Sequence, residues 1–206
     1  MVTEHGVPSV HPLGGLNVGL FTDMLSTVAA WRFAAGRACS TCSRTASGRC
    51  DGGAASVTSV DTSAGVLAWA SGNFGRSGLS KDPRWRFETG DASRFLVRAA
   101  RDKERYDLVI IDPPSTSSAG GVSWALGRDY PELIAKAAAT IPPDGLLWLA
   151  ANTHELGSLG KLAHKGLRAA GRTGTILEQG GLPPEYPTAA VQPVDRYLQV
   201  CLLRIA

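Results

Sequence analysis

Short apolar runs recur along the chain, and each is too short to form a helix of its own. Some are continuous and others alternate with polar residues, as strands do when both faces or one face of a sheet are buried. The runs predict strands at Val57–Val60, Trp85–Glu88, Leu108–Ile111, Leu146–Ala150, Thr173–Leu177 and Tyr197–Leu203.

Between most of these runs, apolar residues recur at the spacing of one helical face. These stripes predict helices around Val66–Phe74, Phe95–Ala100, Leu133–Ile141 and Leu159–Leu167. Strands that alternate with helices are typical of an α/β sandwich with a mainly parallel sheet. The last two runs follow each other without a helix, so we expect them to pair antiparallel, as a hairpin.

The run Leu108–Ile111 is followed by three residues that limit what the strand can do next, Asp112, Pro113 and Pro114. Proline cannot continue a central ladder, so the strand ends there. A carboxylate is then left just beyond the carboxyl edge of the sheet, where open α/β folds bind ligands. The simpler alternative is a turn in which Asp112 only caps a neighbouring element. Ser115–Arg128 is rich in small residues and is predicted to be a loop.

Acidic residues stand at the ends of three successive predicted strands, at Asp61, Asp91 and Asp112. After a second strand, a carboxylate suits the two hydroxyls of a ribose, and after a third it suits an exocyclic amine. For any one of them, a helix N-cap is the simpler interpretation. Three in succession favour a nucleoside-type ligand.

The composition is that of an ordinary globular protein. With 206 residues, 44% hydrophobic and 19% charged, the chain suits one domain. No apolar run reaches the roughly 18 residues that a membrane span needs, and no signal peptide is recognisable, so a cytoplasmic protein without membrane contact is expected. A net charge of +3 gives weak support for a polyanionic partner.

Three of the four cysteines, Cys39, Cys42 and Cys50, lie close together in the sequence. The C-x-x-C spacing raises the possibility of zinc, but no second pair or nearby histidine completes a set of four ligands. We therefore predict no metal. Cys201 lies in an apolar run and is expected to be a buried core thiol.

Several motifs, taken together and in order, resemble the class I S-adenosylmethionine-dependent methyltransferases. They are S-V-D-T-S-A-G-V-L-A-W-A-S-G-N-F, G-D-A-S-R-F-L and Y-D-L-V-I-I-D-P-P-S. N-V-G-L-F-T-D-M, L-P-P-E-Y-P and R-Y-L-Q-V-C-L-L-R add a resemblance to the group that methylates cytosine or guanine in 23S ribosomal RNA. The resemblance covers Asn17–Met24 and Ala54–Ile205, and it leads us to expect no N-terminal RNA-binding module of the kind that some members have.

This resemblance implies a Rossmann-like sandwich with a seven-stranded, mainly parallel sheet and an antiparallel last strand. It further implies an extended lead-in over residues 1–24, a single methyltransferase-like domain over residues 25–206, S-adenosylmethionine as cofactor and RNA as partner. The ribose would be held at Asp61, with Thr62 and Ser63 beside it. The adenine would lie at Gly90, Asp91 and Ala92.

For the chemistry, the resemblance implies that Asp112, Pro113 and Pro114 line the target base and the methyl group, with Asp112 also touching the cofactor. Asn152 stands where some members have a polar residue or cysteine. The sequence L-A-A-N-T has no cysteine, which argues against a covalent route to 5-methylcytosine and favours methylation of a nitrogen. The family often has an aromatic residue after D-P-P-S, but this chain has Thr116, so the usual platform for a flipped base is missing.

Residues 25–51 depart from this pattern. The family's glycine-rich loop after the first strand is replaced by Arg37–Asp51, with no apolar period. One choice of codons for A-C-S-T-C-S-R-T, shifted by two bases, reads V-L-N-L-F-S-Y, the family's first strand. A reading-frame shift over 25–31 and 38–51 is therefore a hypothesis, and it predicts that Ala38–Asp51 is irregular, exposed or low in order and that cofactor affinity is weak or absent.

Two functions stay open on these grounds, a ribosomal RNA methyltransferase and a non-catalytic, decayed protein of the same ancestry. A nicotinamide-dependent oxidoreductase is a weaker third alternative, because no G-x-G-x-x-G follows a first strand.

Overall fold

The structure is a computed structural model that describes residues 2–4, 7–9, 38–42, 54–76, 82–119, 122–182 and 197–206. Its strands are β1 (Val2–Glu4), β2 (Val7–Ser9), β3 (Ala38–Cys42), β4 (Ser56–Asp61), β5 (Trp85–Thr89), β6 (Leu108–Ile111), β7 (Thr116–Ala119), β8 (Val122–Ala125), β9 (Leu146–Asn152), β10 (Gly174–Gly180) and β11 (Leu198–Ile205). Its helices are α2 (Ala64–Arg76), α3 (Ala92–Arg101), α4 (Leu126–Ala138) and α5 (Leu159–Ala169).

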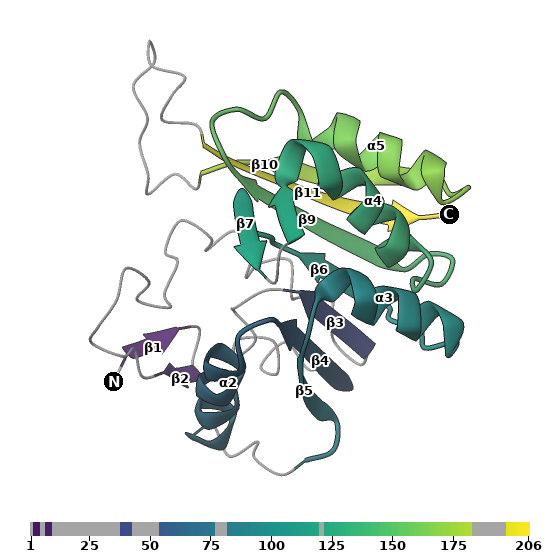
Figure 1. Cartoon of the computed structure of the whole chain (residues 1–206). Coiled ribbons are helices and arrows are strands. Elements are labelled where there is room, and N and C mark those ends of the chain that lie inside the picture. The colour runs from purple at the N-terminus through teal and green to yellow at the C-terminus, as the bar shows by residue number, and fades with distance from the viewer. Residues whose placement is uncertain are drawn as a thin grey trace.

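The largest sheet has seven strands in the order β10-β11-β9-β6-β3-β4-β5 (Figure 1). From β9 to β5 every neighbouring pair is parallel, whereas β11 runs antiparallel to both β9 and β10. The predicted α/β fold is therefore confirmed, as are the interior position of Leu108–Ile111 and the antiparallel pairing of the last two strands.

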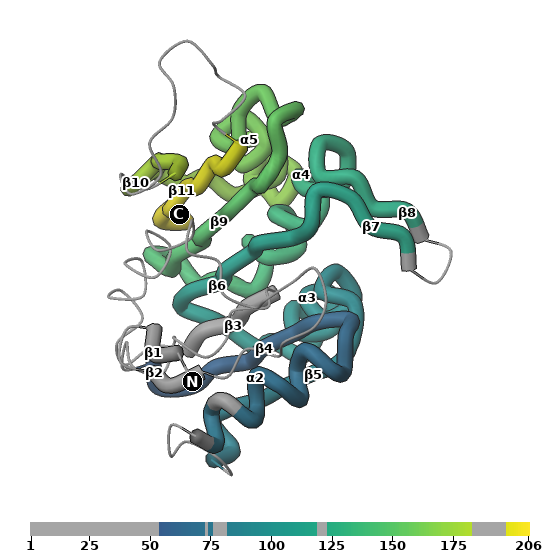
Figure 2. The backbone as a smooth tube through the Cα atoms, turned by 90° about the vertical axis from the view of Figure 1, so that its left-hand side faces the viewer, coloured from purple at the N-terminus to yellow at the C-terminus, as the bar shows by residue number. Residues whose placement is uncertain are grey.

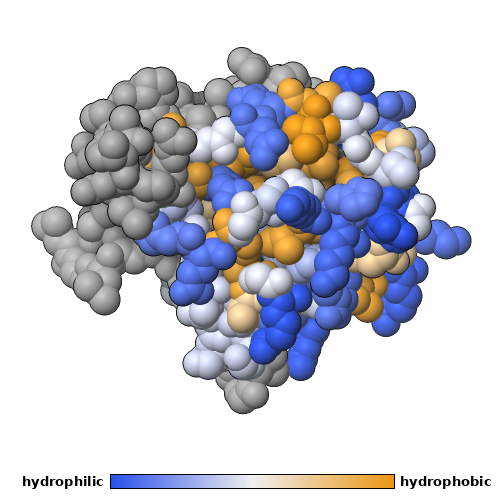
Figure 3. Space-filling model, turned by 90° about the horizontal axis from the view of Figure 1, so that it is seen from above, coloured by the Kyte–Doolittle hydropathy of each residue, from blue (hydrophilic) through white to orange (hydrophobic). Residues whose placement is uncertain are grey.

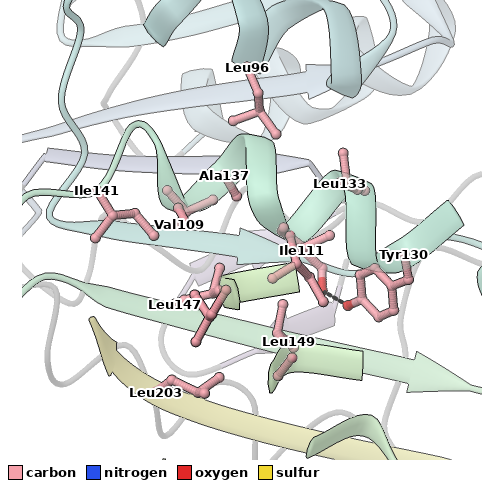
Figure 4. Packing of buried hydrophobic residues seen from close by; sticks show 14 of the residues in the cluster. Leu96, Val109, Ile111, Tyr130, Leu133, Ala137, Ile141, Leu147, Leu149 and Leu203 are labelled. Carbon is pink, nitrogen blue, oxygen red and sulfur yellow. Dashed lines mark hydrogen bonds between the residues drawn. The ribbon is translucent and has the colours of Figure 1, made fainter. Parts of the chain in front are cut away.

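Helices cover both faces of this sheet (Figure 1). On one face, α3, α4 and α5 pack against side chains of β6 and β9, and Leu96, Ala137 and Leu147 belong to the core formed there (Figure 4). On the other face, Leu108, Ile110 and Trp148 belong to a second cluster, while α2 packs on β5. All four residues of β6 are buried, which explains its continuous apolar sequence.

The expectation that Ala38–Asp51 is irregular is wrong for Ala38–Cys42. These residues form β3, which pairs with β4 on one side and β6 on the other. The physical reason is that a central gap would leave the backbone groups of two buried strands without partners. The remaining residues of the anomalous segment, 25–37 and 43–51, lie outside the described residues.

The prediction that Ser115–Arg128 is a loop is wrong for most of the segment. Thr116–Ala119 and Val122–Ala125 pair as an antiparallel hairpin, and α4 begins at Leu126. In Figure 2 the β7–β8 hairpin projects from the body of the molecule, directly after β6. The small residues of β7 are exposed at Thr116, Ser117 and Ser118, whereas Trp124 of β8 is half-buried against the core.

Two further predictions concern the cysteine in β11 and the N-terminal lead-in. Cys201 is fully buried on β11, as predicted, and burial raises the pKa of its thiol to about 11. β1 and β2 form a short antiparallel pair beside α2 (Figure 1). The rest of the lead-in, including Asn17–Met24, lies outside the described residues.

The sheet ends at β10, an edge strand whose seven residues are all exposed. Ile176 and Leu177 are among the large apolar side chains exposed in the described part of the chain. Seen from above, this end of the molecule presents hydrophobic residues among hydrophilic ones (Figure 3). Among the residues described, no helix has the length and apolar character needed to cross a membrane.

Candidate functional site

The predicted site residues gather at one edge of the sheet. Because β4, β5, β6 and β9 are parallel, their carboxyl ends all meet there. The residues at these ends are Asp61, Thr62, Ser63, Gly90, Asp91, Ala92, Asp112, Pro113, Pro114 and Asn152. They fall into two groups on either side of β3, one at β4 and β5 and the other at β6 and β9.

The first group begins with a tight turn at Asp61. One carboxylate oxygen of Asp61 accepts a hydrogen bond of 2.8 Å from the backbone N–H of Ser63. The Ser63 hydroxyl oxygen in turn accepts from the N–H of Val66 at 3.3 Å, so Ser63 caps α2. Thr62, between them, is exposed. This turn holds the Asp61 carboxylate at the sheet edge, half-buried.

The end of β5 is joined to the same turn. The N–H of Gly90 donates to the Asp61 carbonyl oxygen at 2.9 Å. Asp91 follows in extended conformation and accepts from the N–H of Arg94 at 2.9 Å, so it is the N-cap of α3, whose first residue is Ala92. The capping role expected for single acidic residues is thus present at Asp91. Its side chain also remains exposed to solvent at the edge.

The second group is built on the loop after β6. Asp112 and Pro113 are half-buried and Pro114 is exposed. The Ser115 hydroxyl donates to the backbone carbonyl oxygen of Asn152, the last residue of β9. This contact joins the D-P-P-S loop to the end of the neighbouring strand, as the shared sheet edge requires.

Two aromatic residues that the motifs do not indicate also hold this loop. The Tyr130 hydroxyl lies 3.0 Å from the Ile111 carbonyl oxygen and 2.8 Å from that of Ala150, and Figure 4 shows it reaching the end of β6. The Trp124 indole N–H donates to the Pro114 carbonyl oxygen at 2.9 Å. Neither role could be predicted from the sequence. The partners of Tyr130 are distant in sequence, and Trp124 contacts its partner across a hairpin that the sequence did not predict.

Cysteine chemistry finds no support at this edge in the described side chains. Cys201 pairs with Leu149 in the middle of β9, and its buried thiol has a pKa raised to about 11 by desolvation. A thiol with that pKa stays protonated at neutral pH and is a poor nucleophile.

The chain is similar to known proteins in both sequence and fold. No protein-family model matches the sequence. The chain is 32% identical over 137 residues to ribosomal RNA large subunit methyltransferase K/L of Shewanella loihica, covering 66% of this chain and 18% of that protein. It is 36% identical over 103 residues to ribosomal RNA large subunit methyltransferase K of Neisseria meningitidis, covering 49% of this chain and 29% of that protein.

A solved structure described as a methyltransferase in complex with SAH superposes with a TM-score of 0.84 at 22% identity, over 93% of this chain and 51% of that one. This chain has a methyltransferase fold. Its resemblance to the ribosomal RNA large subunit methyltransferases, expected from the motifs, is confirmed. The chain spans less than a third of the length of either curated relative.

Proposed function

We propose that this chain is an S-adenosylmethionine-dependent methyltransferase that modifies a base nitrogen of ribosomal RNA. The observation that carries the proposal is the set of three carboxylates, Asp61, Asp91 and Asp112, after three parallel strands of a methyltransferase fold. The names of the similar curated proteins support the same activity, and the SAH in the similar solved structure supports the cofactor. The domain would span residues 25–206 and act in the cytoplasm.

The residues of the first group suit the nucleoside part of the cofactor. A carboxylate has about four lone-pair positions, and the Ser63 N–H occupies one of those of Asp61, which leaves acceptor capacity for ribose hydroxyls. Thr62 and Ser63 would border the ribose. Gly90, Asp91 and Ala92 would border the adenine, with Asp91 accepting from the exocyclic amine.

The second group suits the base to be methylated. When bound, the cofactor would supply an electrophilic methyl group on a sulfonium. A base nitrogen would form the new N–C bond as the C–S bond breaks, the electron pair of that bond would stay on the departing sulfur, and the methylated nitrogen would lose its proton to solvent. Asp112 would accept a hydrogen bond from the N–H of the base, orienting the nitrogen lone pair. Pro113, Pro114 and Asn152 would border the base and exclude water.

A decayed protein that no longer binds the cofactor is the alternative. The feature that favours it is Arg37–Asp51, which replaces the family's glycine-rich loop. Within that stretch Ala38–Cys42 forms a regular strand between β4 and β6, and the names of the similar curated proteins support the catalytic function. We therefore favour the catalytic function.

The first prediction concerns Asp61. Asp61→Ala should weaken S-adenosylmethionine binding about tenfold or more, because losing a hydrogen bond to a charged group costs roughly 1.5–3 kcal/mol. The affinity is measured by isothermal titration calorimetry. Asp61→Asn keeps an acceptor for the Ser63 N–H but removes the negative charge. It therefore shows whether the affinity depends on the turn or on the charged contact with the ligand.

The matched control is Asp82→Ala. Asp82 precedes β5 at the opposite edge of the sheet and pairs with Arg84, so its removal should leave the affinity unchanged. Equal affinities for all three variants and the natural chain would show that Asp61 is only a turn residue.

The second prediction concerns Asp112. Asp112→Ala should lower methyl transfer to 23S ribosomal RNA by about 100-fold or more, the usual effect of losing a group that orients or stabilises the reacting atoms. Transfer is followed with radiolabelled S-adenosylmethionine. Asp107→Ala, at the opposite end of β6, is the control and should keep its activity. Full activity of Asp112→Ala would contradict the assigned role.

A further inference from the structure

The loop after β6 cannot be fixed by its own backbone donors. Pro113 and Pro114 have no N–H, so two successive residues lack the group that normally anchors a turn. Their carbonyl oxygens can still accept hydrogen bonds from donors elsewhere in the chain. Donors from other parts of the chain therefore help to hold the proline pair beside Asp112.

Three such donors surround the loop. The Tyr130 hydroxyl reaches the Ile111 carbonyl oxygen before the prolines, and the Leu126 N–H donates to the Ser115 carbonyl oxygen at 3.0 Å after them. Between these two points, the Trp124 indole N–H donates to the Pro114 carbonyl oxygen at 2.9 Å. Trp124 is thus the donor bound to the proline pair itself.

A ring contact and hydrogen bonds of the neighbouring backbone hold Trp124 in place. Its half-buried ring meets the ring of Tyr130 edge to face, with centroids 6.4 Å apart. The next residue, Ala125, donates its N–H to the Asp129 carboxylate at 2.8 Å. The Arg128 guanidinium donates to the Ser123 carbonyl oxygen at 2.5 Å and also binds Asp129, whose pKa it lowers. Backbone on both sides of Trp124 is therefore fixed to the first turn of α4.

We propose that Trp124 is a positioning residue for methyl transfer. Through the Pro114 carbonyl it sets the orientation of the proline pair, and with it the approach of the target base to Asp112. The inference rests on the proposed function, and it assigns the β7–β8 hairpin a part in the same site. Trp124 acts on the loop and need not touch the cofactor.

The test replaces only the donor. Trp124→Phe keeps an aromatic ring that can pack on Tyr130 but lacks the indole N–H. We expect kcat for methylation of 23S ribosomal RNA to fall about tenfold or more, since small misplacements of a reacting group are costly. The KM for RNA and the Kd for S-adenosylmethionine should change less than twofold.

A matched control exists in β5. The indole N–H of Trp85 is buried and has no hydrogen-bond partner among the described residues, and Trp85 lies at the edge of the sheet opposite the site. Trp85→Phe makes the same chemical change without breaking a hydrogen bond. It should leave kcat, KM and Kd unchanged.

A second readout does not depend on activity. Hydrogen–deuterium exchange of the peptide spanning 111–118 should be faster in Trp124→Phe than in the natural chain, and unchanged in Trp85→Phe. Unaltered exchange and unaltered kcat in Trp124→Phe would overturn the inference. A natural chain that methylates no RNA would contradict the proposed function, while the exchange comparison would still decide whether Trp124 fixes the loop.

Discussion

Gly166→Ala should lower the free energy of unfolding by about 2–3 kcal/mol, the upper range for forcing an extra group into a packed interface. Gly166 lies in α5 where this helix packs on α4. A Cβ there would stand 2.6 Å from the Pro131 carbonyl oxygen and 2.6 Å from Cγ2 of Ile134. The carbonyl belongs to helix backbone and cannot turn aside, so the two helices must separate.

The measurement is a thermal or denaturant melt, with a shift in Tm of roughly 5–10 °C expected for a chain of this size. Gly160→Ala is the control in the same helix, because a Cβ there would meet its nearest atoms, Ile176 Cδ1 and Ser158 Oγ, at an ordinary 3.7 Å. It should be neutral or stabilise by a few tenths of a kcal/mol, up to about 1, through helix propensity. Equal effects of the two substitutions would contradict the close contact between α4 and α5.

The sequence predicts much of the sheet because local pattern and burial agree in most strands. β6 reads as four apolar residues and is buried on both faces, and β11 is apolar along most of its length. The position of Asp61, Asp91 and Asp112 at one edge then follows from parallel pairing alone. Asp91 caps the helix that its position before that helix predicts.

The rest depends on contacts that local pattern does not record. β3 has the sequence Ala-Cys-Ser-Thr-Cys, and its place between β4 and β6 follows from their need for backbone partners. The β7–β8 hairpin pairs a strand of small residues, Thr-Ser-Ser-Ala, with a strand of only four residues, Val-Ser-Trp-Ala, too short a pattern to indicate a hairpin. Tyr130 lies just before the predicted helix around Leu133–Ile141 and has no role assigned from the sequence, yet its hydroxyl meets two strands that are 19 and 20 residues away.

Tyr130→Phe should destabilise the chain by about 1–3 kcal/mol and also slow methyl transfer, because it removes a buried donor whose one proton lies between two carbonyl oxygens. The Tyr130 side chain is fully buried. Its hydroxyl joins the carboxyl ends of β6 and β9, where the D-P-P-S loop and Asn152 follow. Loss of the hydroxyl should let these two ends move apart, so kcat should fall about tenfold or more while S-adenosylmethionine binding is kept.

Tyr106→Phe is the matched control, because it removes a buried hydroxyl near the opposite end of β6. That hydroxyl donates to the Glu104 carboxylate at 2.5 Å, and burial raises its pKa to about 12, so it remains a neutral donor at the pH of any assay. Its removal should cost about 1–2 kcal/mol of stability and leave kcat unchanged. If Tyr130→Phe and Tyr106→Phe lower stability alike and neither changes kcat, Tyr130 stabilises the core without positioning the site. A loss of kcat confined to Tyr130→Phe would show that the hydroxyl holds the catalytic edge in place.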